Sequence, residues 1–187
     1  MATQKTRFDN AGMEQTKLAD TEYDSYSFVI CNFAEADLSN IKFIDCEFIN
    51  CNFALTKLTN TALRECMFTD CKFSGVHFES CRDLLFEVNF TNCNFSLCSF
   101  YKKSLKGASF KGSKLIEVDF AECNLSKAVF DNCDLSGATF DNTILEGADL
   151  RTAYNYSIDP DSNRIKKAKF SSASVAGLLN KYDIEIE

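Results

Sequence analysis

The residues with the greatest chemical potential in this chain are ten cysteines and a single histidine, His77. Thiolates and imidazoles are the usual ligands of zinc, and paired cysteines also carry redox chemistry. The spacing argues against both, because no two cysteines are separated by only two residues and one histidine cannot complete a mixed site. The carboxylates are spread along the chain, and the fingerprints of phosphate-binding loops, dinucleotide folds and nucleophile elbows are missing. We therefore expect no metal, no cofactor and no enzymatic activity.

The cysteines follow a different rule, a period of five residues. Large apolar residues recur at every fifth position in two phases, from Phe8 to Phe78 and from Leu85 to Leu150, separated by one slip of two residues. Every cysteine lies two positions before such a central position or, for Cys81, before the position 83 that would continue the first phase. The other nine are Cys31, Cys46, Cys51, Cys66, Cys71, Cys93, Cys98, Cys123 and Cys133. No helix and no flat strand repeats every five residues, so the chain must turn regularly and place both residues of each unit inward.

These units resemble those of pentapeptide-repeat proteins, as in ADLSN (36–40), CNFAL (51–55) and GADL (147–150). The resemblance spans residues 8–150 and implies an all-β fold, a right-handed quadrilateral β-helix in which four units make one 20-residue coil. The 29 units then predict about seven coils. Like residues recur at that spacing, as in the column Leu85, Leu105, Leu125 and Leu145, which is what a stacked solenoid would select. Each cysteine is then a small buried thiol, and all ten are expected to stay reduced.

Two charged residues stand at inward positions of this pattern. Asp83 and Lys103 each lie two before a central leucine and are 20 residues apart. We expect a buried ion pair between neighbouring coils, because a lone buried charge would cost several kcal/mol. The alternative is that the slip turns Asp83 outward.

The pattern lapses after Leu150, which divides the chain into an N-terminal tail (1–7), the β-helix (8–150, with the slip near 79–87) and a C-terminal segment (151–187). This last segment contains the only proline and one further unit at 168–170. A serine at 171 or 172 offers a cap for a following α-helix, and the alternating tail predicts a short strand. The segment is expected to cap the last coil and to join two copies in a homodimer. Its candidate interface residues are Val175, Leu178, Leu179, Tyr182, Ile184 and Ile186.

Outward charge alternates in sign along the chain. The formal net charge is −7, with −7 in residues 8–53, +4 in 54–116 and −7 in 117–149, and the middle block includes the lysine-rich stretch 102–114. An acidic rod favours a basic partner surface and argues against direct nucleic-acid binding. The N-terminal sequence has no apolar leader and no apolar run is long enough to span a bilayer, so we expect a cytoplasmic protein without membrane contact.

The tail sharpens the resemblance. The segments NYSIDPDSNRIKKAKF and GLLNKYDIEIE resemble the quinolone-resistance (Qnr-type) branch of the family. This implies a homodimer that mimics DNA, binds DNA gyrase or topoisomerase IV, and gives fluoroquinolone resistance or toxin immunity. Many Qnr-type proteins carry two projecting loops, whereas the only irregularity expected here is the two-residue slip, which implies weak or absent protection while binding persists. The acidic residues expected to meet the enzyme are Asp119, Glu122, Asp131, Asp134, Asp141, Glu146 and Asp149. The alternative interpretation is a repeat scaffold for an unrelated protein partner, contacted through the lysines at 102–114.

Overall fold

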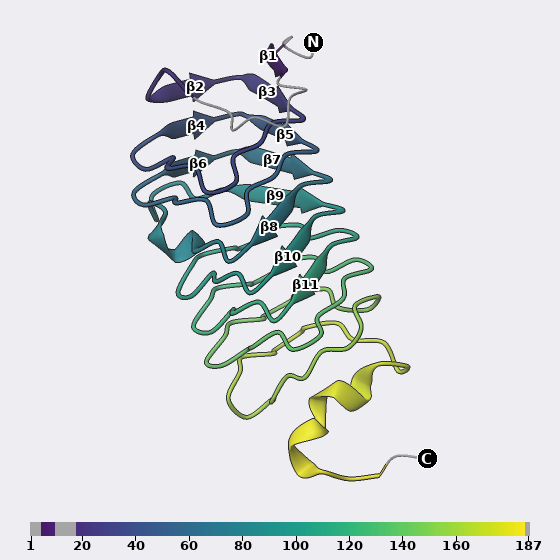
Figure 1. The fold of residues 1–187 in the computed structure, drawn as a ribbon. Coiled ribbons are helices and arrows are strands. Elements are labelled where there is room, and N and C mark those ends of the chain that lie inside the picture. Colours follow the sequence, from purple (N-terminus) through teal and green to yellow (C-terminus); the bar gives the residue numbers. More distant parts are fainter. Residues whose placement is uncertain (1–4, 10–17, 186–187) are drawn as a thin grey trace.

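The chain winds into a right-handed, all-β solenoid, shown by a computed structural model that describes residues 5–9 and 18–185. Figure 1 shows the coils stacked in chain order, with the C-terminal segment folded beyond the last coil. The strands in the described residues are β1 (Thr6–Asp9), β2 (Glu22–Asp24), β3 (Tyr26–Val29), β4 (Lys42–Ile44), β5 (Glu47–Ile49), β6 (Ala62–Arg64), β7 (Cys66–Thr69), β8 (Lys72–Ser74), β9 (Val88–Thr91), β10 (Asn94–Ser96) and β11 (Lys114–Ile116). One 3₁₀ turn, η1 (Phe78–Ser80), lies between β8 and β9.

The strands pair in parallel along three sides of the solenoid. The sheets follow the orders β1-β3-β5-β7-β9, β2-β4-β6 and β11-β10-β8. Paired residues are 20 apart, as for Phe28 with Phe48. The fourth side is held by isolated bridges at the same spacing, such as Asp37 with Lys57. Four five-residue units therefore make one coil, and each coil contacts its neighbours through parallel backbone pairing.

The expected number of coils is not supported. The strand-paired part of the solenoid makes about five coils, counted on its largest sheet of five strands, rather than about seven. Beyond β11 the same 20-residue pairing continues only as isolated bridges, up to Asp149 with Lys169. In these later coils a single residue on each side keeps the paired geometry.

Phenylalanine rings fill the lumen in stacked columns. Phe28, Phe48 and Phe68 stack with ring centroids 4.9 and 4.8 Å apart, and Phe78 stacks on Phe100 at 4.4 Å. All five rings are buried. Parallel strands about 4.8 Å apart bring identical side chains into register, so stacking follows directly from the 20-residue repeat.

The residue two positions before each centre points inward and lies against the backbone of the neighbouring coil. The Cys51 thiol, for example, lies 3.5 Å from the carbonyl oxygen of Phe28, one coil away. All ten cysteines are buried thiols, which confirms their predicted structural role. Burial raises the pKa of Cys123 and of Cys133 to about 12, and small thiols fit where a larger side chain would push the coils apart.

Each unit turns at the second residue after its centre. Asn40, Asn50 and Asn60 occupy this position with φ of 64°, 54° and 57°. The left-handed region costs least for asparagine, aspartate and glycine, which explains the polar residues between the apolar ones. A left-handed residue at most of these positions turns the chain through a corner, and this is the origin of the five-residue period.

The two extra residues of the slip are accommodated at one corner, and the predicted place of Leu85 is wrong there. Leu85 does not fill the lumen: it is 46% exposed with φ of 59°, and the neighbouring Phe86 is buried in its place. The predicted leucine column is therefore wrong at its first member, although its other three members are buried. Pairing between β7 and β9 is offset by 22 residues instead of 20, and the extra residues leave the wall at Leu84, which is 80% exposed.

The described C-terminal residues form neither the expected α-helix nor the expected strand. Two short 3₁₀ helices, η2 (Val175–Leu178) and η3 (Asn180–Tyr182), take their place, and residues 183–185 are irregular. Ser174 precedes η2 without a side-chain cap, and Gly177 lies within it. A stretch this short is well below the roughly 12 residues that a marginal isolated helix needs. Ile186 lies outside the described residues.

Candidate interaction surfaces

The seven acidic residues of the 117–149 block do not share one surface. Asp119, Glu122 and Asp141 lie on one side of the rod, because the Glu122 amide donates to the Asp141 carbonyl at 2.8 Å and Asp119 pairs with Thr139. The rings of Phe120 and Phe140 lie behind this side, stacked in the lumen with centroids 5.4 Å apart. We call Asp119, Glu122 and Asp141 the acidic flank.

The other four acidic residues lie elsewhere on the rod. Asp131 and Asp134 flank the turn at Asn132, two corners further along the chain than Glu122. Asp149 is bridged to Val129, on the side of the rod that precedes this turn. Glu146 lies on a third corner, where its carbonyl accepts the Lys127 amide at 2.9 Å. Consecutive units point to different sides, so a run of acids in the sequence becomes a dispersed set in space.

Several of these acids already have partners within the chain. The ion pairs are Glu122–Lys102 at 3.5 Å, Glu146–Arg164 at 2.7 Å and Asp149–Arg151 at 2.7 Å. Hydrogen bonds from Arg151 lower the pKa of Asp149 to about 2. Desolvation alone would raise the pKa of Asp134, but hydrogen bonds from Ser136 and Asn155 outweigh it and lower the value. Part of the acidity is therefore neutralised internally.

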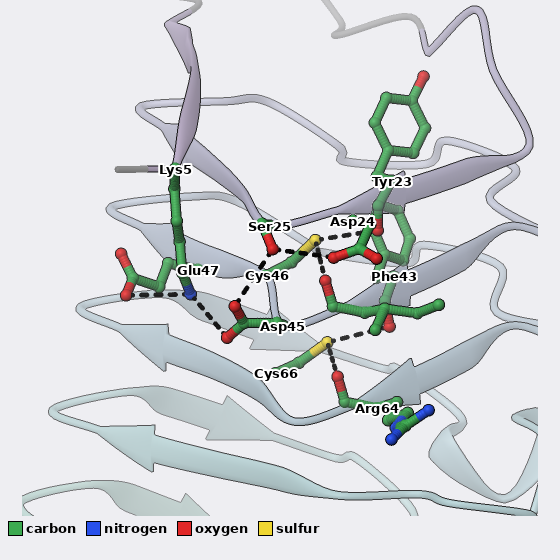
Figure 2. A network of polar contacts seen from close by, with 11 residues as sticks. Lys5, Tyr23, Asp24, Ser25, Phe43, Asp45, Cys46, Glu47, Arg64 and Cys66 are labelled. Carbon is green, nitrogen blue, oxygen red and sulfur yellow. Dashed lines mark hydrogen bonds and ion pairs between the residues drawn. The ribbon is translucent and has the colours of Figure 1, made fainter. Parts of the chain in front are cut away.

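A second acidic cluster lies at the N-terminal end. Figure 2 shows Lys5 reaching from the residue before β1 to Asp45 and Glu47, with contacts of 3.1 and 3.2 Å. Ser25 Oγ donates to Asp24 at 2.8 Å and also approaches Asp45 at 3.3 Å. Burial alone would lower the pKa of Lys5, but its hydrogen bonds to the two carboxylates raise it. Lys5 thus ties the first strand to a coil 40 residues away and compensates two acids.

The predicted pair of Asp83 and Lys103 is present in a different form. Lys103 Nζ lies 2.6 Å from Asp83 Oδ1, donates to the Cys81 carbonyl at 2.5 Å, and sits 5.3 Å from the centre of the Phe86 ring. The Lys103 side chain is 2% exposed, whereas that of Asp83 is 88% exposed. Only the lysine is buried, because the slip turns Asp83 outward. Lys103 therefore fastens the slip to the next coil.

The candidate dimer residues lie beyond the last coil. The segment is docked there by the Ile158 amide, which donates to the Gly177 carbonyl at 3.0 Å, and by Leu178, which packs against the core. Leu179 is half-buried. Val175, Tyr182 and Ile184 are 43%, 54% and 55% exposed. This end of the rod therefore presents apolar side chains to solvent.

Sequence reasoning missed a group of lysines at one corner. Lys106, Lys127, Lys166 and Lys167 line a groove of about 430 Å³. The expected lysine stretch at 102–114 is not one surface, because its members fall on different sides. The 20-residue coil length could have predicted this group, because positions 127 and 167, like 106 and 166, differ by multiples of 20 and so lie in the same column.

The described residues, 5–9 and 18–185, contain no group of His, Cys, Asp and Glu side chains that could hold a metal ion. Over the same residues, no helix has the length and apolar character needed to cross a membrane. The histidine lies on the surface, where the His77 Nδ1 is 2.8 Å from Glu79 Oε1.

Parallel coils of five-residue units with a stacked aromatic lumen define a repeat β-solenoid. Comparison with known families agrees: the pentapeptide repeat region matches residues 84–154, and pentapeptide repeats (8 copies) match residues 31–70 and 46–82. Together these matches cover about two thirds of the sequence. The chain belongs to the pentapeptide-repeat family.

Two solved structures of a fluoroquinolone resistance protein share this fold. Full-length QnrB1, a plasmid-mediated fluoroquinolone resistance protein, is 17% identical with a TM-score of 0.50, covering 87% of this chain and 90% of that one. A trypsin-treated QnrB1 variant is 19% identical with a TM-score of 0.51 and 98% coverage of both chains. HetL, involved in heterocyst differentiation regulation in the cyanobacterium Nostoc sp. strain PCC 7120, is 12% identical with a TM-score of 0.38, covering 81% and 88%. The chain therefore resembles the Qnr-type branch in fold. No curated protein matches the sequence.

Proposed function

We propose that this protein is a non-catalytic, DNA-mimicking ligand of DNA gyrase or topoisomerase IV in the bacterial cytoplasm, which modulates the enzyme and gives fluoroquinolone resistance or toxin immunity. Three features support the proposal: membership of the pentapeptide-repeat family, the Qnr-like tail sequence, and a fold shared with a fluoroquinolone resistance protein.

The observation that carries the proposal is the acidic flank on a rigid rod. Asp119, Glu122 and Asp141 project from neighbouring coils about 4.8 Å apart, and the stacked rings behind them hold the wall in place. Duplex DNA carries one charge per roughly 1.7 Å, so the flank is a sparser array than DNA itself. Attraction to the basic DNA-binding surface of a topoisomerase would depend on long-range electrostatics and would weaken with salt.

The proposed assembly is a homodimer formed through the C-terminal end. Val175, Tyr182 and Ile184 leave apolar surface exposed beyond the last coil, and a two-fold contact would cover the same patch on both copies. Joining two rods at this end would lengthen the acidic array without any new sequence.

The test is a gyrase supercoiling assay with purified protein, at low and moderate salt, with and without a fluoroquinolone. Inhibition that weakens as salt rises, or supercoiling restored in the presence of drug, supports the proposal. The absence of any effect on both gyrase and topoisomerase IV at high micromolar protein would refute it.

A matched pair of variants locates the surface. Neutralising the acidic flank with D119N, E122Q and D141N should abolish most of the effect. The control, E35Q, D37N and D70N, changes net charge by the same amount at exposed positions nearer the N-terminal end. Equal losses in the two variants would show that total charge, and not this flank, is responsible.

A second function, a repeat scaffold for an unrelated protein, is favoured by a different observation. Leu55 and Leu97 are 59% and 61% exposed at turn positions of one corner, on either side of Gly75. A Cβ at Gly75 would lie 2.9 Å from Leu55 Cδ2, so the leucine lies across the glycine and forms a small apolar ridge. For this function, L55S with L97S would abolish partner binding, and neutralising the acidic flank would leave it intact.

A further inference from the structure

Four lysines converge on one corner of the C-terminal half of the rod. Lys106, Lys127, Lys166 and Lys167 are all exposed and line a groove of about 430 Å³. Three backbone hydrogen bonds stack these coils: Gly107 to Ser126, Lys127 to Glu146, and Gly147 to Lys166, at 2.9, 2.9 and 3.0 Å. The four ammonium groups therefore belong to one continuous surface, which we call the lysine groove.

The lysines of this groove are available for a ligand. Within the described part of the chain none of the four takes part in an ion pair, although other lysines, such as Lys42 and Lys169, do. The single acid in the lining, Glu146, is held by Arg164 through contacts of 2.7 and 3.1 Å to the same carboxylate oxygen. The groove thus keeps an excess of positive charge on a chain whose net charge is −7.

Two glycines share the turn column of this corner with Lys127 and Lys167, and one of them, Gly147, lines the groove. A Cβ at Gly107 would meet no atom within 4 Å, and one at Gly147 would meet only Lys127 Cγ at 3.6 Å. Both have left-handed φ values, 74° and 69°, as the turn position requires. The turn positions of successive coils are Gly107, Lys127, Gly147 and Lys167, so glycine and lysine alternate along the corner. Backbone without a side chain therefore separates the charges and leaves room for a ligand to approach.

The geometry points to an acidic, extended peptide segment of a protein partner as the ligand of the lysine groove. From the coil of Lys106 to that of Lys167 there are three steps, or about 14 Å at strand spacing. Alternate side chains of an extended peptide are about 6.8 Å apart, so three alternating carboxylates span nearly the same length. A long polyanion is disfavoured, because its charges would continue past the groove onto acidic parts of the rod such as Asp131 and Asp141.

The experiment measures binding of a short fluorescent peptide that alternates glutamate with serine, using the full-length protein and fluorescence anisotropy. The same peptide with glutamine in place of glutamate is the ligand control. The variant K106Q, K127Q and K167Q should weaken binding about tenfold or more, given the modest strength of each exposed pair. The matched variant K57Q, K72Q and K111Q alters exposed lysines on other parts of the rod and should change affinity by less than about twofold.

Zero-length carbodiimide cross-linking gives an independent readout, since it joins a carboxylate only to a lysine that touches it. Cross-links confined to the four groove lysines support the assignment, and circular dichroism checks that each variant is folded. Equal weakening by both lysine variants, or no binding at all, overturns the proposal. Tighter binding of a single-stranded oligonucleotide of equal charge, lost in the groove variant, would instead assign the groove to nucleic acid. None of these readouts depends on a topoisomerase.

Discussion

The half-buried pair of Lys103 and Asp83 makes an unusual prediction: removing the exposed partner should cost more than removing the buried one. In the native chain the Lys103 side chain is 2% exposed, and Asp83→Ala leaves only the Cys81 carbonyl and the Phe86 ring beside its ammonium group. Loss of a buried charge's partner costs about 3–5 kcal/mol in full burial, and exposure of Asp83 reduces this to about 2 kcal/mol. Lys103→Met leaves Asp83 free to hydrate and deprives one carbonyl of its donor, a cost of about 1 kcal/mol.

The assay is thermal unfolding followed by circular dichroism. For a chain of this length 1 kcal/mol shifts the Tm by roughly 2–4 °C, so Asp83→Ala should lower it by about 4–8 °C and Lys103→Met by about half as much. The double variant should resemble Lys103→Met alone, because no buried charge remains to be stranded. Hydrogen exchange of residues 79–90 reports whether the loss is local. A Lys103→Met variant less stable than Asp83→Ala, or additive losses in the double variant, would refute this account.

Further predictions concern the lumen, the C-terminal end and the thiols. Phe100→Ala should destabilise the fold by about 3–5 kcal/mol, because its buried ring stacks 4.4 Å from Phe78; an unchanged unfolding midpoint would contradict this. Gly177→Ala should raise hydrogen exchange in residues 174–182 but not in the coils, since a Cβ there would clash with the Tyr156 carbonyl oxygen. The carboxyl of Asp149 should titrate near pH 2 by NMR: its lowered pKa favours the folded state at neutral pH, and this contribution is lost as pH falls toward 2. Arg151→Gln should return the midpoint toward 3.8. A thiol reagent at pH 8 should label none of the ten cysteines until the protein is unfolded, whereas rapid native labelling would show that the wall is open.

The five-residue period predicted the lumen well, because a single geometric rule governs every unit. A small residue must face the wall, a large one must fill the lumen, and a left-handed residue must follow, so Cys51 and Phe53 could be placed without coordinates. The burial of all ten cysteines follows from the same rule.

The rule fails where the chain leaves the repeat. At the slip, sequence spacing favoured Leu85 as the lumen residue, yet the corner takes up the extra residues and Phe86 is buried. In the C-terminal segment the apolar spacing suggested an α-helix, but a 3₁₀ turn forms there, with Gly177 packed against Tyr156 too closely for a Cβ. These outcomes depend on tertiary contacts that a local pattern does not contain.

The surfaces were the least predictable part. Net charge along a stretch of sequence does not describe one face of the rod, because each coil distributes neighbouring units over four sides. Glu122 and Asp141 meet although they are 19 residues apart, while Asp131 and Glu146 do not. The 20-residue coil that aligns the leucines also places Lys127 in one column with Lys167.

The 22-residue step at the slip has a consequence for how such a chain can change in evolution. The lumen columns resume in register after it, with the ring centroids of Phe68 and Phe90 stacked 5.1 Å apart. The two extra residues therefore do not disturb the packing of the other coils. Elsewhere, an insertion that is not a whole number of units would shift every later side chain out of its place. The corner at Leu84 is thus a point where added residues do not shift the five-residue register. New segments inserted there would extend outward while both halves of the rod keep their packing.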